Sequence, residues 1–252
     1  MEFELFTIVA LILAGIIGGF INTLAGGGSM LTLPALMMLG MPADVANATN
    51  RIGVLLQSLT GAKGFKDAGR LDSAAIGPIL IPTLIGALVG ALGASYLPVT
   101  FLKPILLGSM VLMAVIMLVR PDTLSPPEGT APKKLKDTPM AMGSLFFAGV
   151  YGGFVQAGVG FILIAALAGS LRYDLLRTNA LKTVCTAVFS GVALIIFAVR
   201  GQVLWVPGLV LALGSVVGAM ISVRFAIKVQ QNTLKWMLLV MVTISCGAAL
   251  FA

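Results

Sequence analysis

The sequence predicts an all-α polytopic membrane protein that contains two inverted-topology repeats. Three observations lead to this prediction: a composition that is 59% hydrophobic and only 10% charged, apolar stretches long enough to cross a bilayer core of about 30 Å, and an internal duplication. Soluble domains are about 45–50% apolar and about 25% charged. This composition therefore leaves little sequence for a soluble domain.

The composition also excludes several classes of function. Histidine is absent, and Cys185 and Cys246 lie in apolar runs, so neither a metal site nor a disulfide framework is expected. The 9 acidic residues lie at span ends or in loops, away from the membrane positions where pumps and acid–base enzymes need them. The net charge of +7 is typical of loops that orient a membrane protein and contact lipid headgroups. We therefore expect no enzyme activity, no cofactor and no nucleic-acid partner.

A polar segment at residues 120–139, rich in proline and charge, divides the chain into two similar halves. AGIIGGF at 14–20 recurs as AGVYGGF at 148–154. Beyond these stretches a constant offset aligns further pairs: Gly26 with Gly158, Gly28 with Gly160, Asn47–Ala48 with Asn179–Ala180, and Gly86–Ala87 with Gly218–Ala219. We therefore predict a first transmembrane repeat at 1–119, a cytoplasmic linker at 120–139 and a second transmembrane repeat at 140–252.

Each repeat is expected to begin with a broken helical hairpin. Its two members are predicted at 5–24 and 29–40 in the first half, and at 139–157 and 159–171 in the second. The second member has only about 12 residues, or about 18 Å as a helix, which is too short to cross the bilayer. We therefore expect it to be re-entrant. The alternative is a tilted crossing through a thinned bilayer, which gives about eight apolar helices by the conventional count.

Three full-length spans then follow in each half, predicted at 45–63, 73–97 and 101–119 and at 177–199, 203–228 and 233–252. Lys and Arg favour the cytoplasmic side of a membrane. If each short segment returns to its own side, the number of crossings per half is odd and the halves are inverted. Most basic residues, including Lys63, Arg70 and Arg177, then face the cytoplasm, and both chain ends lie outside. Four crossings per half would make the halves parallel and distribute the basic residues more evenly.

Glycines interrupt the hairpin in each half, at Gly26–Gly28 and at Gly158 and Gly160. Non-helical backbone at membrane depth is tolerated only where protein or a water-filled cavity satisfies its polar groups. The helix N-terminus exposed by such a break carries positive partial charge and free N–H donors, which transporters use to bind anions. Ser29 is positioned to cap the helix that follows. The alternative is that these glycines only allow close helix packing.

A polar stripe follows the break in each half. Its members lie at i, i+3 and i+4 on one helix face: Asn47, Asn50 and Arg51 in the first half, and Asn179, Lys182 and Thr183 in the second. Both cations lie inside predicted spans, where a charge costs about 2.5–3.5 kcal/mol. Asp44 and Asp174 precede the two stripes and are expected as helix N-caps, with pairing to Arg51 or Arg177 as the alternative. Because no acidic residue lies near mid-membrane, we expect an anionic substrate to supply the counter-charge. Snorkelling of both side chains to the headgroups is the alternative.

Together these features resemble the sulfite exporter TauE/SafE family. The resemblance is carried by GGFINTLAGGGSMLTLPALMMLGMPADVANATNRIGVLLQS and KGFKDAGRLD, and by GVYGGFVQAGVGFILIAAL, LLRTNALKTV and FAVRGQV in the second half. It implies an integral inner-membrane permease that exports sulfite or small organosulfonates. The positions that match are Gly26 to Ser29, Asn47 to Arg51, Gly158 to Gly160 and Asn179 to Thr183. The second glycine run is GVG, whereas the first is GGG. This difference argues against equal participation of the two halves in substrate binding.

The sequence thus predicts a multi-pass secondary transporter of the cell inner membrane that exports a small anion, sulfite or a related sulfur oxyanion or organosulfonate. A passive anion channel and a permease for a small carboxylate are the alternatives. The candidate substrate-binding residues are Asn22, Gly26, Gly27, Gly28, Ser29, Asn47, Thr49, Asn50, Arg51, Gln156, Gly158, Gly160, Asn179, Lys182 and Thr183. No catalytic or metal-binding residue is predicted. Lipid is the expected partner besides the substrate, and the oligomeric state is left open.

Overall fold

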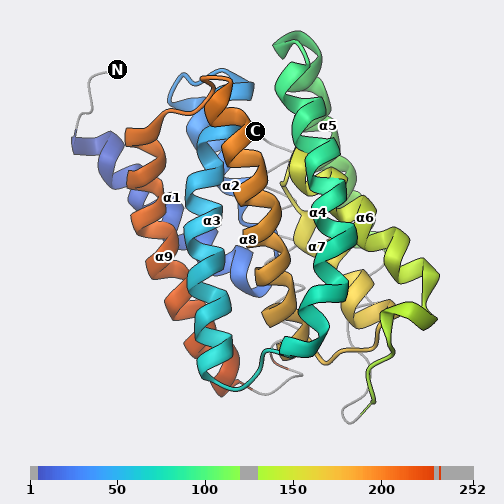
Figure 1. Ribbon diagram of the computed structural model, residues 1–252. Coiled ribbons are helices and arrows are strands. Elements are labelled where there is room, and N and C mark those ends of the chain that lie inside the picture. The colour runs from blue at the N-terminus through green and yellow to red at the C-terminus, as the bar shows by residue number, and fades with distance from the viewer. Residues whose placement is uncertain (1–4, 120–129, 230–232, 234–252) are drawn as a thin grey trace.

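The computed structural model describes residues 5–119, 130–229 and 233, and these residues form a helical bundle (Figure 1). The helices of the first half are α1 Leu5–Leu24, α2 Ser29–Met38, α3 Ala43–Asp67, α4 Ser73–Tyr96 and α5 Val99–Val119. The second half contains the 3-10 helix η2 Leu135–Asp137, α6 Pro139–Phe154, α7 Val159–Ile164, the π-helical segment η3 Ala165–Ser170, α8 Leu175–Val199 and α9 Trp205–Lys228. No strand occurs within these described ranges, which confirms the all-α prediction.

Four helices of the described chain are long and apolar enough to cross a membrane, namely α1, α4, α8 and α9. The helices after the two breaks are shorter, as predicted: α2 has 10 residues, or about 15 Å, and the α7–η3 segment is also a short apolar helix. The α3 helix is not among the four although it has 25 residues. Its asparagines, Arg51 and terminal lysines lower its hydropathy.

Most predicted boundaries lie within a few residues of the observed helix ends. The prediction at 5–24 matches α1, whereas α3 extends beyond the predicted 45–63 at both ends. The predicted segment 139–157 ends earlier, with α6 at Phe154. The predicted span at 233–252, apart from residue 233, lies outside the described residues, as do residues 120–129 of the linker. The rest of the linker contains η2, and α6 begins at the linker's last residue.

Two pairs of equivalent long helices have equal lengths. Both α3 and α8 have 25 residues, and both α4 and α9 have 24. Gly69 and Gly201 follow α3 and α8 with φ of 67° and 69°, and the residue after each glycine donates its N–H to the carbonyl at i−5. A left-handed residue of this kind is a common C-terminal cap. The sequence duplication therefore extends to the local backbone.

The halves pack against each other through crossed pairs of helices, since α1 lies along α9 and α6 lies along α4. Glycines bring these backbones close together. A Cβ on Gly15 or Gly19 would collide with α9, and a Cβ on Gly149 or Gly153 would collide with α4. Such close approach is typical of helix pairs in membranes, where small residues line the contact.

The central contact joins α3 and α8, which run in opposite directions (Figure 1). The direction also follows from the contacts, because Gly61 late in α3 faces Thr183 early in α8, while Leu55 faces Gly191. The α4 and α9 helices likewise run in opposite directions in Figure 1. Every pair of equivalent long helices that the view shows clearly is therefore antiparallel.

Several basic segments meet at one end of the bundle. The Tyr173 hydroxyl donates to Asp72 Oδ2 at 3.4 Å, which joins the segment before α8 to the start of α4. The Lys133 N–H donates to the Leu171 carbonyl at 2.8 Å, which joins the linker to the end of η3. Arg177 lines the same hollow as these residues. The cytoplasmic placement of this end remains a prediction.

Candidate functional site

The two helix breaks meet inside the bundle. Gly26 and Gly158 have φ of 86° and 79°, a left-handed conformation that favours glycine. A Cβ on Gly26 would collide with the backbone of Gly160, and a Cβ on Gly28 would collide with the carbonyl of Gly18. Backbone conformation and close packing therefore both require glycine here.

Asn50 on α3 connects to the first turn of α2. Its Nδ2 donates to Ser29 Oγ at 3.2 Å, and its Oδ1 accepts from Thr32 Oγ1 at 2.7 Å. The expectation that Ser29 caps α2 is wrong, because the N-cap residue is Gly28 and no side chain caps it. Ser29 is the first helical residue, one position too late to cap. No backbone carbonyl of the described residues accepts from the N–H groups of Gly27, Gly28 or Ser29.

Arg51 is fully buried and binds the C-terminal end of α6. Its Nη1 donates to the Gly152 carbonyl, and its Nη2 donates to the Gly153 carbonyl at 2.9 Å and the Phe154 carbonyl at 3.3 Å. Asn47 joins this group, since its Nδ2 donates to Phe154 at 2.9 Å and its Oδ1 accepts from Arg51 at 3.3 Å. The last carbonyls of a helix lack intrahelical partners and carry negative partial charge. They are the partner of this guanidinium.

Lys182 repeats this arrangement with the halves exchanged. Its Nζ donates to the Thr23 carbonyl, near the end of α1, at 2.9 Å, and to Asn179 Oδ1 at 2.8 Å. Lys182 is only 1% exposed, so snorkelling is the wrong explanation for both cations. A helix end of the opposite half therefore already accepts hydrogen bonds from each cation, and the counter-charge from an anionic substrate stays a prediction. We call these two sets of contacts the crossed caps.

Unpaired polar atoms surround the crossed caps. Four buried side-chain atoms there have no hydrogen-bond partner among the described residues: Thr23 Oγ1, Arg51 Nε, Gln156 Oε1 and Asn179 Nδ2. Buried polar atoms in proteins nearly always have a partner, either protein or ordered water. Arg51 Nε and Asn179 Nδ2 are donors, which an anion oxygen or a water molecule can satisfy.

The remaining predicted residues divide into two groups. Asn22 is buried beside Gly28, and Gln156, with φ of 70°, donates through Nε2 to Ser190 Oγ at 3.1 Å. Thr49 and Thr183 are directed elsewhere. Thr49 Oγ1 accepts from the Leu204 N–H at 3.0 Å, at the start of α9, and Thr183 Oγ1 donates to a carbonyl of its own helix. Both hydroxyls therefore already have hydrogen-bond partners within the protein.

Sequence reasoning missed three residues of this region. Thr32 lies three residues after Ser29 and therefore on the same face of α2. The same spacing relates Asn47 and Asn50 on α3. Ser190 lies on α8, two turns beyond Lys182. The Arg51 guanidinium also lies over the Phe197 ring, with 5.5 Å from Cζ to the ring centroid, and no local pattern predicts that contact.

Similarity to known proteins extends over nearly the whole chain. A family model described as Sulfite exporter TauE/SafE matches residues 11–249. The chain belongs to the TauE/SafE family. The resemblance predicted from the two breaks and the two stripes is thereby confirmed.

Three related proteins are each described as probable membrane transporters. A probable membrane transporter protein of Haemophilus influenzae is 26% identical over 243 residues, which are 96% of this chain and 93% of the relative. Probable membrane transporter protein ORF9 of Sinorhizobium sp is 28% identical over 244 residues, with shares of 96% and 91%. Probable membrane transporter protein YfcA of Escherichia coli K12 is 24% identical over 241 residues, with shares of 96% and 88%. This TauE/SafE protein is therefore a multi-pass membrane transporter.

Proposed function

We propose that this TauE/SafE transporter exports a small anion, sulfite or a related sulfur oxyanion or organosulfonate, across the cell inner membrane as a secondary transporter. The observation that carries the proposal is an unpaired buried donor, Asn179 Nδ2, beside the buried Lys182 ammonium at the end of α1. Sulfite presents several acceptor oxygens and no bulky group. Charged and amide donors suit such an anion, and hydrogen bonds to charged groups are the strong ones.

The proposed architecture is a pair of inverted repeats, at 1–119 and 140–252, joined by a cytoplasmic linker. The antiparallel course of α3 and α8 supports this arrangement, as do the equal lengths of α3 and α8 and of α4 and α9. The crossed caps support it further, because the cation of each half binds the first helix of the other half. A two-fold relation between the halves would produce contacts of this kind.

In the proposed site, the substrate lies between the N-terminal end of α2 and the stripe on α8. The N–H groups of Gly27–Ser29 and the positive end of the α2 dipole would face one side of the anion. Asn179 and Lys182 would face the other side, with Gln156 accepting from a protonated form such as hydrogen sulfite. Movement of one repeat against the other would then expose the site to each side of the membrane in turn.

Asn179→Asp tests the proposal in proteoliposomes. The carboxylate retains the acceptor for Lys182, so the fold should be preserved, but the amide donor is replaced by a negative charge. Loss of one strong hydrogen bond to an anion, about 1.5–3 kcal/mol, should lower sulfite flux by about 10–100-fold. Thr100→Asp is the matched control, because it adds the same charge at an exposed position in the first turn of α5 and should leave flux unchanged.

The flux assay also separates the alternatives. Sulfite, thiosulfate, sulfoacetate and acetate are compared over a concentration series. Saturable sulfite flux supports the transporter, flux that rises linearly with concentration indicates a channel, and preference for acetate indicates a carboxylate permease. Wild-type sulfite flux in Asn179→Asp would remove this amide from the substrate site.

A further inference from the structure

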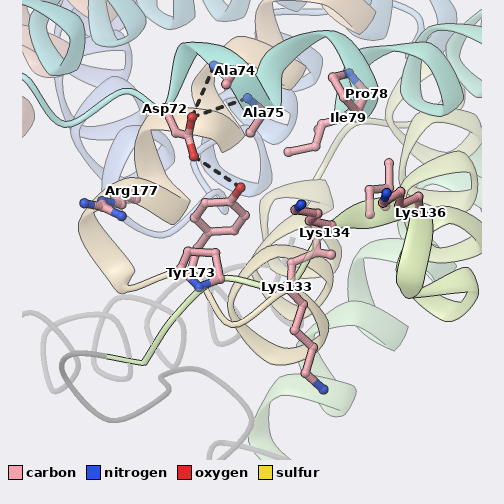
Figure 2. A pocket seen from close by; sticks show the side chains of 13 residues that line it. Asp72, Ala74, Ala75, Pro78, Ile79, Lys133, Lys134, Lys136, Tyr173 and Arg177 are labelled. Carbon is pink, nitrogen blue, oxygen red and sulfur yellow. Dashed lines mark hydrogen bonds between the residues drawn. The ribbon is translucent and has the colours of Figure 1, made fainter.

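A basic pocket lies at the end of the bundle where the linker, α4 and α8 meet. It is a cavity of about 570 Å³, and we define it by Asp72, Lys133, Lys134, Lys136, Tyr173 and Arg177, which line it. Figure 2 shows Lys134 and Lys136 near Pro78 and Ile79, while the Lys133 side chain extends away from them. The positive-inside rule explains the presence of lysines at such an end, but it does not explain why they line a cavity.

The lysines are free to bind an anion, because the other charged groups of the basic pocket already have partners. Asp72 accepts from the N–H groups of Ala74 and Ala75 at 3.2 and 3.4 Å and from the Tyr173 hydroxyl. Burial, and then the negative charge of Asp72, raise the pKa of Tyr173 to about 12, so this hydroxyl remains a donor. No carboxylate of the described chain forms an ion pair with any of the three lysines, while Arg177 pairs with its neighbour at i−3.

The segment that carries the lysines is held in place. The Lys133 N–H donates to the Leu171 carbonyl at 2.8 Å. Leu135, between Lys134 and Lys136, is only 9% exposed and belongs to one apolar cluster with Ile79. The ammonium groups are therefore presented from a fixed backbone, which lowers the entropy lost when an anion binds.

An apolar groove continues from the basic pocket along the outside of α4 and α6. It is a hollow of about 670 Å³, lined by Pro78, Ile81, Ile85, Met142, Gly143 and Phe146 among others. Pro78, Leu135 and Lys136 line both the groove and the basic pocket. Ile81 is 63% exposed and Ile85 51% exposed, so an apolar occupant of the groove would cover them. Cationic and apolar surface are thus continuous.

We propose that the basic pocket and the apolar groove together bind one anionic phospholipid. Its phosphate lies at Lys134 and Lys136, and one acyl chain lies along α4 and α6 in the groove. The charge of the pocket matches an anionic headgroup, and basic pockets beside membrane helices are known to hold such headgroups. The groove selects a lipid over a soluble phosphate, because only a lipid covers Ile81 and Ile85. This site is separate from the crossed caps and does not depend on the transported substrate.

The test uses the full chain in detergent micelles, titrated with dioleoylphosphatidylglycerol or dioleoylphosphatidylcholine and observed by native mass spectrometry. Wild-type protein should prefer the anionic lipid. The double variant Lys134→Gln/Lys136→Gln should bind it about 30-fold more weakly, as expected for two basic residues at an anionic surface. Lys63→Gln/Lys66→Gln is the matched control, because these exposed lysines end α3 and line neither hollow. It should retain wild-type affinity.

A second pair of variants tests the groove. A Cβ on Gly143 has nothing within 4 Å, so Gly143→Leu should fill the groove without disturbing the core. It should weaken binding of both lipids by about tenfold, equivalent to about two methylene groups losing contact. Gly108→Leu on α5, where a Cβ is equally unobstructed, is its control.

Three results would overturn the proposed headgroup site, and a fourth would overturn the proposed acyl-chain site. The first three are equal affinity for the two lipids in wild-type protein, an equal loss in the Lys63→Gln/Lys66→Gln control, and displacement of the bound lipid by millimolar inorganic phosphate. The last result would identify a site for soluble anions. Gly143→Leu and Gly108→Leu that bind lipid equally well would remove the acyl chain from the groove.

Discussion

Arg51→Lys is the variant that tests the crossed caps most directly. Alanine would remove charge and donors together, so that lost folding and lost transport could not be separated. Lysine retains the charge but has one nitrogen in place of the planar fork of arginine. The second half shows what one ammonium achieves in this setting, because Lys182 Nζ reaches one helix-end carbonyl and one asparagine oxygen. We therefore expect the ammonium introduced by Arg51→Lys to satisfy one carbonyl of α6 at most.

The magnitude follows from the carbonyls left without a donor. Phe154 would still accept from Asn47. Gly152 and Gly153 have no donor other than Arg51 among the described residues, so at least one of them loses its partner. A buried carbonyl without a donor costs about 1–3 kcal/mol, and loss of the arginine fork removes further charged hydrogen bonds. We expect Arg51→Lys to lower the free energy of unfolding by about 2–4 kcal/mol.

The assay is unfolding in mixed micelles with increasing sodium dodecyl sulfate, followed by far-ultraviolet circular dichroism. Arg200→Lys is the control. Arg200 is exposed and stacks on Tyr96, with 4.4 Å from Cζ to the ring centroid, and loss of an exposed contact of this kind costs at most about 1 kcal/mol. If the two variants unfold at the same detergent fraction, the Arg51 hydrogen bonds to the end of α6 do not stabilise the fold. The crossed caps would then not contribute to the free energy of unfolding.

Three further variants address other contacts. Lys182→Met should lower the free energy of unfolding by about 1–3 kcal/mol in the same titration, because the Thr23 carbonyl loses its ammonium donor; unchanged unfolding would contradict the second cap. Gly26→Ala should reduce the yield of folded protein in size-exclusion chromatography, because a Cβ at φ of 86° is strained and collides with Gly160; Gly143→Ala, at an unobstructed position, should not. For Tyr173, burial and the adjacent carboxylate raise the pKa from 10.0 to about 12, so deprotonation is penalised in the folded protein. Stability should therefore be independent of this group below pH 10 and should fall between pH 10 and about 12. Tyr173→Phe should remove this part of the alkaline slope, and an identical slope in the variant would show that another group causes it.

Local patterns in the sequence were sufficient to predict the breaks and the stripes. Glycine runs mark positions where the backbone must turn or approach closely, and the left-handed Gly26 and Gly158 are two such positions. The stripe prediction also succeeded, since Asn47 pairs with Arg51 and Asn179 pairs with Lys182 in the structure. These pairs lie within one helix, where spacing alone fixes which side chains meet.

The partners across the halves could not be predicted in this way. Arg51 binds the carbonyls of residues 152–154, which lie 101 to 103 residues further along the chain. No periodic pattern in the sequence relates positions so far apart. The same limit applies to the length of α3. Hydropathy falls at Lys63, but the helix continues to Asp67 because backbone hydrogen bonds do not require apolar side chains. The basic pocket was missed because Leu135 and the Lys133 N–H anchor a segment that composition alone describes as a linker.

The crossed caps give a physical reason why a broken helix and a buried cation occur together in each half. A helix that ends within a membrane leaves carbonyl groups that lipid cannot satisfy. A cation from the opposite half supplies donors and opposes the negative end of the helix dipole. As a result, Arg51 and Lys182 each join the two halves, and any movement of one half against the other must preserve these bonds or replace them. An anion that takes up the unused Asn179 Nδ2 would bind at the joint that Lys182 forms. Substrate binding and the relative position of the halves would then be coupled through Lys182.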